Sequence, residues 1–229
     1  SPEDQVLLNK IEKDTLQYFT RFSDKLTGLT KDSSRSGSPS SVAATGFALA
    51  AYAIGGSRGW LAQDYAYARI LTTLQTLRHK AAHEQGFFYH FLDPRTGKRV
   101  WGSEASSIDT ALAVAGALLA ARYYPGTEIE QLANEIYERI NWKWMMNGSD
   151  FICMGWTPES KFLPYYWDSY NELMILVALA VGSPTLPVPP KAWERWLRPE
   201  GTYNNHKVIY ASTGSLFTYQ FSHAYIDFR

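Results

Sequence analysis

The sequence predicts an all-α protein, an α/α toroid of helical hairpins of the (α/α)6-barrel type. Three stretches, 40–54, 106–124 and 168–181, each open with Ser or Asp and continue into a run rich in Ala, Gly and Leu. A turn and then an amphipathic or Trp-containing segment follow each run. The spacing of roughly 60 residues is typical of stacked helical hairpins. A helix that is apolar all round must be buried, so we expect these three to form an inner layer.

The N-terminal part of the chain predicts a first hairpin with an approach segment. Residues 3–22 have apolar side chains near helical spacing and predict an amphipathic helix. The polar, glycine-containing segment 27–41 predicts a loop, and 58–78 predicts the first outer helix. In 86–101, two aromatic runs flank Asp93–Lys98, which predicts a β-hairpin.

The outer helix of the second hairpin is the clearest amphipathic helix in the chain. Its apolar residues follow helical spacing: Ile129, Leu132, Ala133, Ile136, Tyr137 and Ile140. Residues 142–166 predict an aromatic loop with a short strand near 151–156. The third inner helix is expected at 169–181, and a short outer helix at 191–197. The segment 216–229 predicts the beginning of another inner helix.

Composition narrows the class of protein. The 229 residues hold 22 basic and 22 acidic side chains, so we expect no nucleic-acid partner. No apolar run is long enough for a membrane span, and no secretory leader is visible at the start. We expect one domain, 1–229. The single Cys153 excludes an intrachain disulfide and predicts a buried apolar residue.

Four carboxylates are the candidates for chemistry. Glu104 precedes the second inner helix and Asp109 lies in its first turn, while Asp168 and Glu172 are expected on one face of the third. If the inner helices run parallel, all four converge on one mouth of the barrel. Aromatic residues accompany them in sequence: Tyr89, His90, Trp101, Trp156, Trp167 and Tyr170. Carboxylates walled by aromatic rings suit glycoside hydrolysis, in which one carboxyl protonates the leaving oxygen and another activates water or attacks.

The expected environments suggest different roles. A helix N-terminus favours negative charge, so Asp109 and Asp168 should stay ionised. A general acid needs a raised pKa, which desolvation or a nearby like charge provides. Glu172, expected inside an apolar helix and near Asp168, is the first choice for proton donor, and Glu104 is the second.

Structural roles compete with these catalytic ones. Asp109 and Asp168 fit helix capping, and Glu172 could hold an arginine in the core. His79 and His83 are spaced i, i+4, but the residues between them lack the Glu of a zinc-protease helix. No third ligand is evident, so we expect no metal and no cofactor.

Six motifs, in order, resemble the glycoamylase-like family, which includes bacterial endo-β-1,2-glucanases and a domain of cyclic β-1,2-glucan synthases. They are GFFYHF (86–91), EASSIDTAL (104–112), NWKWM (141–145), MGWTPE (154–159), WDSYNE (167–172) and SHAYIDFR (222–229). The resemblance implies an (α/α)6 barrel acting on a glycan, plausibly a β-1,2-glucan. It implies that Glu172 is the acidic catalyst, and that Glu104, Asp109, Phe88, His90 and Trp156 line the substrate cleft.

The resemblance also raises a question of completeness, because family barrels need twelve helices and this chain supplies about half to two-thirds of a ring. We expect the domain to lack the C-terminal part of the barrel, and its open edge to be covered in a homodimer. Three functions follow: a glucan hydrolase, a non-catalytic glycan-binding or dimeric assembly module, and, more remotely, another toroid activity such as a cyclase. Members with leaders work in the periplasm, so a periplasmic or extracellular location is expected, with the cytoplasm left open.

Overall fold

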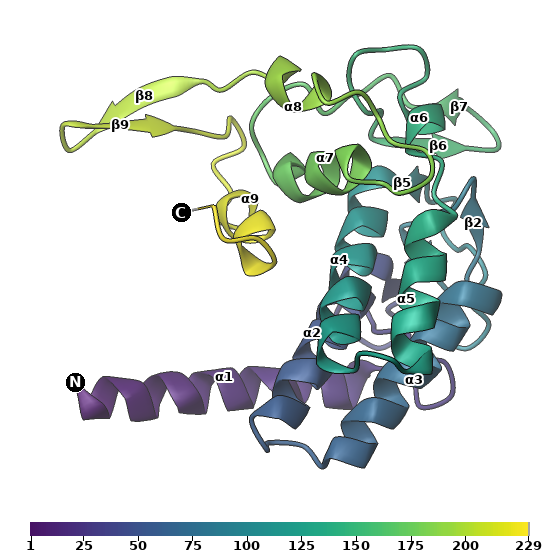
Figure 1. Cartoon of the computed structure of the whole chain (residues 1–229), viewed down its shortest axis with the longest axis vertical. Helices are drawn as coiled ribbons and strands as arrows, with labels where there is room; N and C mark the ends of the chain where they lie inside the picture. The colour runs from purple at the N-terminus through teal and green to yellow at the C-terminus, as the bar shows by residue number, and fades with distance from the viewer. Residues whose placement is uncertain (229) are drawn as a thin grey trace.

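The computed structural model describes residues 1–228, and its architecture is mainly helical (Figure 1). The long helices are α1 (Pro2–Phe22), α2 (Val42–Ser57), α3 (Gln63–His79), α4 (Ser107–Tyr123), α5 (Glu128–Glu138) and α7 (Leu173–Val181). Short helices are α6 (Trp142–Met145), α8 (Ala192–Arg195) and α9 (Phe217–Gln220), followed by a 3-10 turn, Ser222–Ala224. None of the helices in the described part is long and apolar enough to cross a membrane.

The strands are short and form four small antiparallel sheets. β1 (Ser40–Ser41) pairs with β4 (Phe91–Leu92), and β2 (His83–Glu84) with β3 (Phe87–Phe88). A three-stranded sheet has the order β5 (Ala105–Ser106), β6 (Gly155–Thr157), β7 (Lys161–Phe162). The last sheet pairs β8 (Glu200–Tyr203) with β9 (His206–Ile209) and projects from the body beside α9 (Figure 1).

The layering of inner and outer helices expected from the sequence is present. α2 and α4 lie side by side, with α3 and α5 packed on their outer side (Figure 1). A side chain at Gly46 or Gly116 would not fit between the inner pair, since a Cβ on Gly116 would lie 2.0 Å from the Gly46 carbonyl oxygen. Glycine thus permits the close approach of the two backbones.

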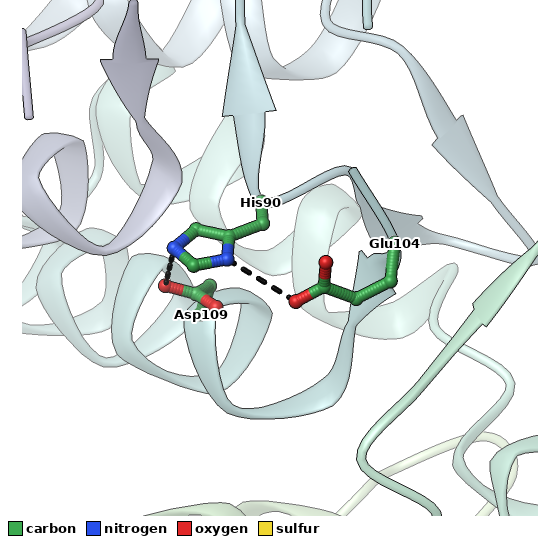
Figure 2. A group of neighbouring side chains, drawn as sticks. All are labelled: His90, Glu104 and Asp109. Carbon is green, nitrogen blue, oxygen red and sulfur yellow. Dashed lines mark hydrogen bonds and ion pairs between the residues drawn. The ribbon is translucent and has the colours of Figure 1, made fainter. Parts of the chain in front are cut away.

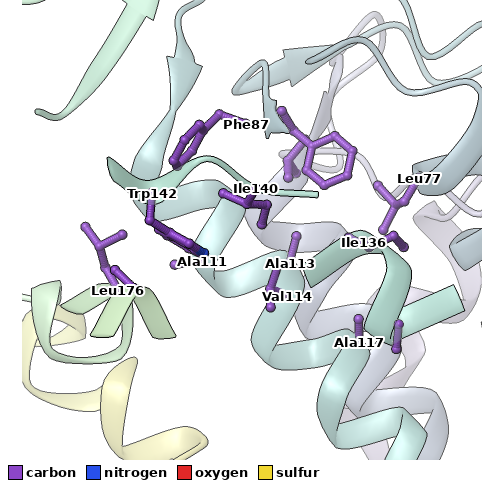
Figure 3. Close-up of a cluster of buried hydrophobic side chains, with 14 of the residues drawn as sticks. Leu77, Phe87, Ala111, Ala113, Val114, Ala117, Ile136, Ile140, Trp142 and Leu176 are labelled. Atoms are coloured by element: carbon purple, nitrogen blue, oxygen red, sulfur yellow. The ribbon is translucent and has the colours of Figure 1, made fainter. Parts of the chain in front are cut away.

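The core lies between the inner and outer helices and continues under the aromatic loop. Its side chains come from α2, α3, α4, α5, α7 and the segments around β3 and α6, most of which Figure 3 shows. Trp142, Phe87 and Ile140 are fully buried there, and the rings of Phe87 and Trp142 meet edge to face at 5.4 Å. Cys153 is buried too, as expected from the sequence.

Several boundaries differ from the sequence prediction. α3 begins at Gln63 rather than Arg58, because residues 58–62 turn back on the end of α2. The turn at Asp93–Lys98 forms and is closed by the bridge between Leu92 and Arg99. The aromatic residues before it form two strands, of which β3 pairs with β2 and β4 with β1. The β8–β9 hairpin was not predicted, because its sequence is polar and lacks an alternating apolar face. The described residues of 216–228 form only two short helical turns.

Candidate functional site

Backbone pairing brings His90 and Glu104 to the starts of two inner helices. The carbonyl oxygen of His90 accepts from the Val42 amide, the first residue of α2, at 3.1 Å. The His90 amide donates to the carbonyl oxygen of Glu104 at 2.8 Å, and Glu104 directly precedes β5 and α4. The N-termini of α2 and α4 therefore meet at this pair of residues. A helix N-terminus carries partial positive charge, which favours carboxylates placed beside it.

The side chains of His90, Glu104 and Asp109 form one cluster (Figure 2). The imidazole lies between the two carboxylates: Nδ1 is 3.1 Å from Glu104 Oε1, and Nε2 is 3.6 Å from Asp109 Oδ1. The side chains of His90 and Glu104 are 30% and 28% exposed, whereas that of Asp109 is only 10% exposed. Solvent thus reaches the histidine and Glu104 more easily than the aspartate.

The first turn of α4 fixes Asp109. Ser106 is the N-cap of this helix, and its Oγ accepts from the Asp109 amide at 3.3 Å. The same hydroxyl donates to Asp109 Oδ2 at 2.5 Å. Asp109 is thus part of the capping arrangement, as one sequence interpretation proposed. Its second carboxylate oxygen is the one that faces His90, so capping and membership of the cluster coexist.

Charges within the cluster shift the pKa values of His90 and Glu104 in opposite directions. Burial disfavours the imidazolium, but the hydrogen bond to Glu104 and the charge of Asp109 outweigh it and raise the pKa of His90 above its usual range. Burial likewise disfavours ionised Glu104, but the His90 hydrogen bond and charge hold the pKa of Glu104 below its usual range. An ionised glutamate beside a protonated histidine is the state these shifts favour.

Asp109 differs from the expectation that a helix start keeps it strongly ionised. Burial raises its pKa, and the opposing effects of His90 and the Ser106 hydrogen bond do not cancel that rise. Desolvation therefore outweighs the helix N-terminus, since the dipole contributes only about 0.3–1 kcal/mol.

Glu172 joins the cluster electrostatically from the third inner helix. Burial raises the pKa of its carboxyl, and the charge of Asp109 adds to the rise. This is the direction expected for a proton donor. Glu104, the second choice for that role, has the opposite shift.

The placement of Glu172 corrects the sequence prediction. α7 begins at Leu173, so Glu172 is its N-cap rather than an interior residue, and Asp168 lies outside the helix. The two carboxylates therefore do not share a helix face. Asp168 is exposed, and its backbone pairs with Leu197. Ser222 Oγ donates to the Glu172 carbonyl at 2.9 Å and accepts from the Ile175 amide at 3.1 Å, which ties the C-terminal turn to this helix start.

Two predicted substrate-binding residues belong to the core instead. Phe88 is fully buried, with its amide bonded to Thr110 Oγ1 and the Arg139 guanidinium over its ring. Trp167 is 7% exposed, and its indole N–H donates to Ser107 Oγ at 2.8 Å. That bond ties the segment before α7 to the start of α4. Both rings are thus packed in the core of this structure, and their contact with a glycan stays a prediction.

The other predicted aromatics are at least partly accessible. Trp101 is 69% exposed. Trp156 is half-buried, with its ring near Trp144 and under the Lys161 ammonium. Tyr170 is half-buried between Trp196 and Tyr219. Their contact with a glycan stays a prediction.

The cluster could also hold a metal ion. Within residues 1–228, His90, Glu104 and Asp109 each offer a ligand atom within 4.8 Å of the others. Imidazole with two carboxylates is a donor set that zinc accepts. The sequence expectation of no metal therefore stays a prediction. His79 and His83 form no such group among the described residues; the His83 ring instead accepts from the Gly86 amide at 3.3 Å.

Sequence reasoning missed the residues that hold the cluster in place. Phe91 stacks on the His90 ring with centroids 3.9 Å apart, and Gly155 lies directly against the Glu104 side chain. Gly155 was visible in the sequence only as part of a motif. Neither residue type signals a catalytic site by itself.

Comparison with known proteins agrees with this architecture. Residues 164–229 match the model of the Glycoamylase family, described as "Putative glucoamylase", so the resemblance seen in the sequence is confirmed for that segment. No curated protein matches the chain.

Three solved structures illustrate the fold. An endo-β-1,2-glucanase from Chitinophaga pinensis, in complex with sophorotriose and glucose, is 22% identical with a TM-score of 0.85 over 96% of this chain. A "putative glucoamylase" from Bacteroides uniformis is 22% identical with a TM-score of 0.89, again over 96% of this chain. A β-1,2-glucanase from Parabacteroides distasonis is 22% identical with a TM-score of 0.78 over 84% of this chain. At these identities the likeness establishes the helical fold.

The chain spans only part of these proteins. It covers 59% of the Chitinophaga and Bacteroides uniformis chains and 30% of the Parabacteroides chain.

Proposed function

We propose that this chain carries the acid–base centre of a glycoside hydrolase acting on a glucan, plausibly a β-1,2-glucan. The observation that carries the proposal is the cluster of His90, Glu104 and Asp109 at the starts of α2 and α4, to which the Asp109 charge couples Glu172. The shared fold with an endo-β-1,2-glucanase supports the choice of substrate.

The pKa shifts divide the roles. Glu172 is the proposed proton donor, because burial raises its pKa and keeps a proton available for the leaving oxygen. Glu104 is the proposed base or nucleophile, because His90 keeps it ionised. His90 would hold Glu104 in place through the 3.1 Å contact, and buried Asp109 would raise the pKa of Glu172 further. The partly exposed Trp156 and Tyr170 are proposed to contact sugar rings.

The proposed test is reducing-sugar release from β-1,2-glucan. We expect Glu172→Gln to lower turnover by at least about 100-fold, the usual contribution of a general acid, while sophorotriose binding persists. Glu194→Gln, an exposed carboxylate on α8, is the matched control and should leave the rate unchanged. Equal rates for wild type and Glu172→Gln would remove the donor assignment. The anomer formed first, read by NMR, would separate inversion from retention.

A second function rests on the share of the solved structures that the chain spans. If residues outside this chain supply part of the catalytic machinery, the chain is a glycan-binding or assembly module. Calorimetry would then register sophorotriose binding by a chain that releases no reducing sugar.

Self-association and location complete the proposal. A partial ring completed by a second copy remains our model of the assembly; exposed apolar residues on α1, among them Val6, Leu7 and Ile11, support it. A sedimentation coefficient of a monomer at micromolar concentration would contradict it. A periplasmic or extracellular location is proposed from the family resemblance, and fractionation of the source cells would test it.

A further inference from the structure

A hollow lies at the end of α1, separate from the cluster. Its volume is about 660 Å³, within the range of small-molecule sites. It is lined by the end of α1 and the segments 23–25, 37–39, 93–95 and 100–101. The lining includes neither His90, Glu104 nor Asp109.

The hollow is rich in cationic side chains. Arg21, Lys25, Lys31 and Arg95 line it, and none of them forms an ion pair within the described residues. Lys31 is half-buried and the other three are exposed. In a chain with no net charge, this concentration of cations favours an anionic ligand.

The two carboxylates in the lining are committed to the backbone. Asp24 Oδ1 accepts from the amides of Leu26 and Thr27 at 2.8 and 3.0 Å. Asp93 Oδ1 accepts from the amides of Arg95 and Thr96 at 3.0 and 2.8 Å. Both fix turns, as aspartates at such positions commonly do. They keep their charge, and hydrogen bonds from Thr96 together with the charge of Arg95 lower the pKa of Asp93. The four cations therefore outnumber the two carboxylates of the lining by two.

An aromatic platform forms one wall. Trp101 is 69% exposed, and its backbone has φ 59°, a left-handed conformation that is costly for a bulky residue. Arg99 holds this strained loop: its guanidinium donates to the carbonyl oxygens of Ser103 and Gly102 at 2.5 and 2.6 Å. It also forms a bidentate pair with Glu159 at 2.7 and 2.9 Å. Strain retained by such contacts is typical of functional positions.

The platform connects the hollow to the proposed catalytic cluster. The Trp101 ring packs on Phe91 with centroids 5.2 Å apart, and Phe91 stacks on His90 at 3.9 Å. Two adjoining rings, Trp101 and Phe91, thus lead from the hollow to the imidazole. One oligosaccharide could contact the cluster with one residue and Trp101 with another.

We propose that this hollow is a subsite for an anionic substituent, a sulfate, phosphate or carboxylate carried by a saccharide whose neutral ring packs on Trp101. The inference rests on the proposed glycan function, and it predicts that the chain prefers acidic oligosaccharides to neutral ones. Lys31 and Arg95 would contact the anionic group.

The test is calorimetric titration with three probes: sophorotriose, sophorotriose carrying one sulfate ester, and inorganic sulfate. At low ionic strength we expect the sulfated sugar to bind between about 2-fold and about 30-fold more tightly than the neutral one, the range that two exposed ion pairs give. The preference should shrink at 1 M salt, where screening is strong.

Variants identify the residues responsible for the preference for the sulfated sugar. Lys31→Gln combined with Arg95→Gln should abolish the preference and leave the affinity for neutral sophorotriose unchanged. Lys13→Gln combined with Lys207→Gln removes two exposed cations elsewhere and should retain it. Trp101→Ala should weaken both sugars. Circular dichroism of each variant checks that the fold persists.

Several results would overturn the inference: equal affinities of wild type for the two sugars, a preference that survives in the Lys31/Arg95 variant, or inorganic sulfate binding as tightly as the sulfated sugar. Failure of the proposed function has a different signature. In that case no reducing sugar is released and neutral sophorotriose does not bind, yet the sulfated sugar still binds in a manner that depends on Lys31 and Arg95.

Discussion

Replacement of Gly155 by alanine tests whether Glu104 raises the pKa of His90. Gly155 lies in β6 opposite Ser106, and a Cβ placed on it would lie 2.6 Å from Glu104 Cγ and 3.0 Å from the Ala105 carbonyl oxygen. Carbon atoms in good contact are about 3.5–4.0 Å apart. The flexible Glu104 side chain must therefore move by about 1 Å, whereas the backbone at Ala105 has to give by much less.

A movement of that size is enough to break the contact with His90. The Nδ1–Oε1 distance is 3.1 Å, so a shift of about 1 Å away from the ring takes it beyond hydrogen-bond range. A hydrogen bond to a charged group contributes about 1.5–3 kcal/mol. Both side chains remain partly exposed, so we expect the Gly155→Ala variant to lose about 1 kcal/mol of unfolding free energy.

The loss should depend on pH in a defined way. The pKa of His90 is raised in the folded state, so its contribution is complete below the ordinary value of 6.5 and disappears as the pH rises through the raised value. The pKa of Glu104 is lowered, so its contribution is complete above the ordinary value of 4.5 and disappears as the pH falls through the lowered value. The difference between wild type and Gly155→Ala should therefore be largest between pH 4.5 and 6.5.

Urea unfolding across this pH range and an NMR titration of the His90 ring measure the two effects. The titration midpoint of His90 should fall in the variant. Gly201→Ala, in β8, is the matched control, because the nearest atom to its new Cβ would be Tyr210 Cδ1 at 3.3 Å, far from the cluster in sequence and sheet. An unchanged His90 midpoint in Gly155→Ala would refute the reasoning that Glu104 sets the histidine's charge.

Three further predictions concern packing, charge and metal. Gly116→Ala should lower the unfolding free energy by about 1–3 kcal/mol, because the new methyl group overpacks against the Gly46 carbonyl. Helix propensity alone predicts the opposite, a gain of about 1 kcal/mol. A rise in Tm on thermal unfolding would therefore contradict the close crossing of α2 and α4. His90→Gln should destabilise the protein by about 1 kcal/mol at pH 6 and by less at pH 9, because the contribution of the histidine to stability is lost above its raised pKa. Chemical denaturation at both pH values measures the two losses. An equal loss at both would count against a charged His90. Dialysis against EDTA should leave Tm unchanged, because the His90 ring already lies between the two carboxylates and contacts both without an ion. A fall in Tm that zinc reverses would identify the cluster as a metal centre.

Most of the helical fold could be predicted from the sequence because its signals are local. The all-apolar runs of α2 and α4 require burial on every side, and Ser41 and Ser106 mark their starts as N-caps. The start of α7 was misplaced because Asp168 resembles a helix cap, whereas the chain first pairs its backbone with Leu197. That pairing depends on residues far along the chain and leaves no local pattern.

The site could be predicted only as a set of candidates. The sequence predicted that Glu104, Asp109 and Glu172 lie close together, because all three precede or begin inner helices. Their pKa values could not be predicted, because these depend on how far each carboxyl is buried. Phe88 and Trp167 belong to motifs of the family resemblance, yet the structure buries both. A motif preserves a core contact as readily as a ligand contact, so sequence alone could not separate the two roles.

The balance between burial and helix polarity explains why three carboxylates at similar places acquire different charge states. All lie near the N-terminus of an inner helix, where the dipole favours ionisation by about 0.3–1 kcal/mol. Glu104 gains His90 as a direct partner, and its pKa falls. Asp109 is buried in the first turn of α4, and Glu172 is half-buried where the Asp109 charge acts on it, so the pKa values of both rise. The site therefore combines one carboxyl with a lowered pKa and two with raised pKa values, and a pair of carboxyls shifted in opposite directions is what acid–base hydrolysis requires.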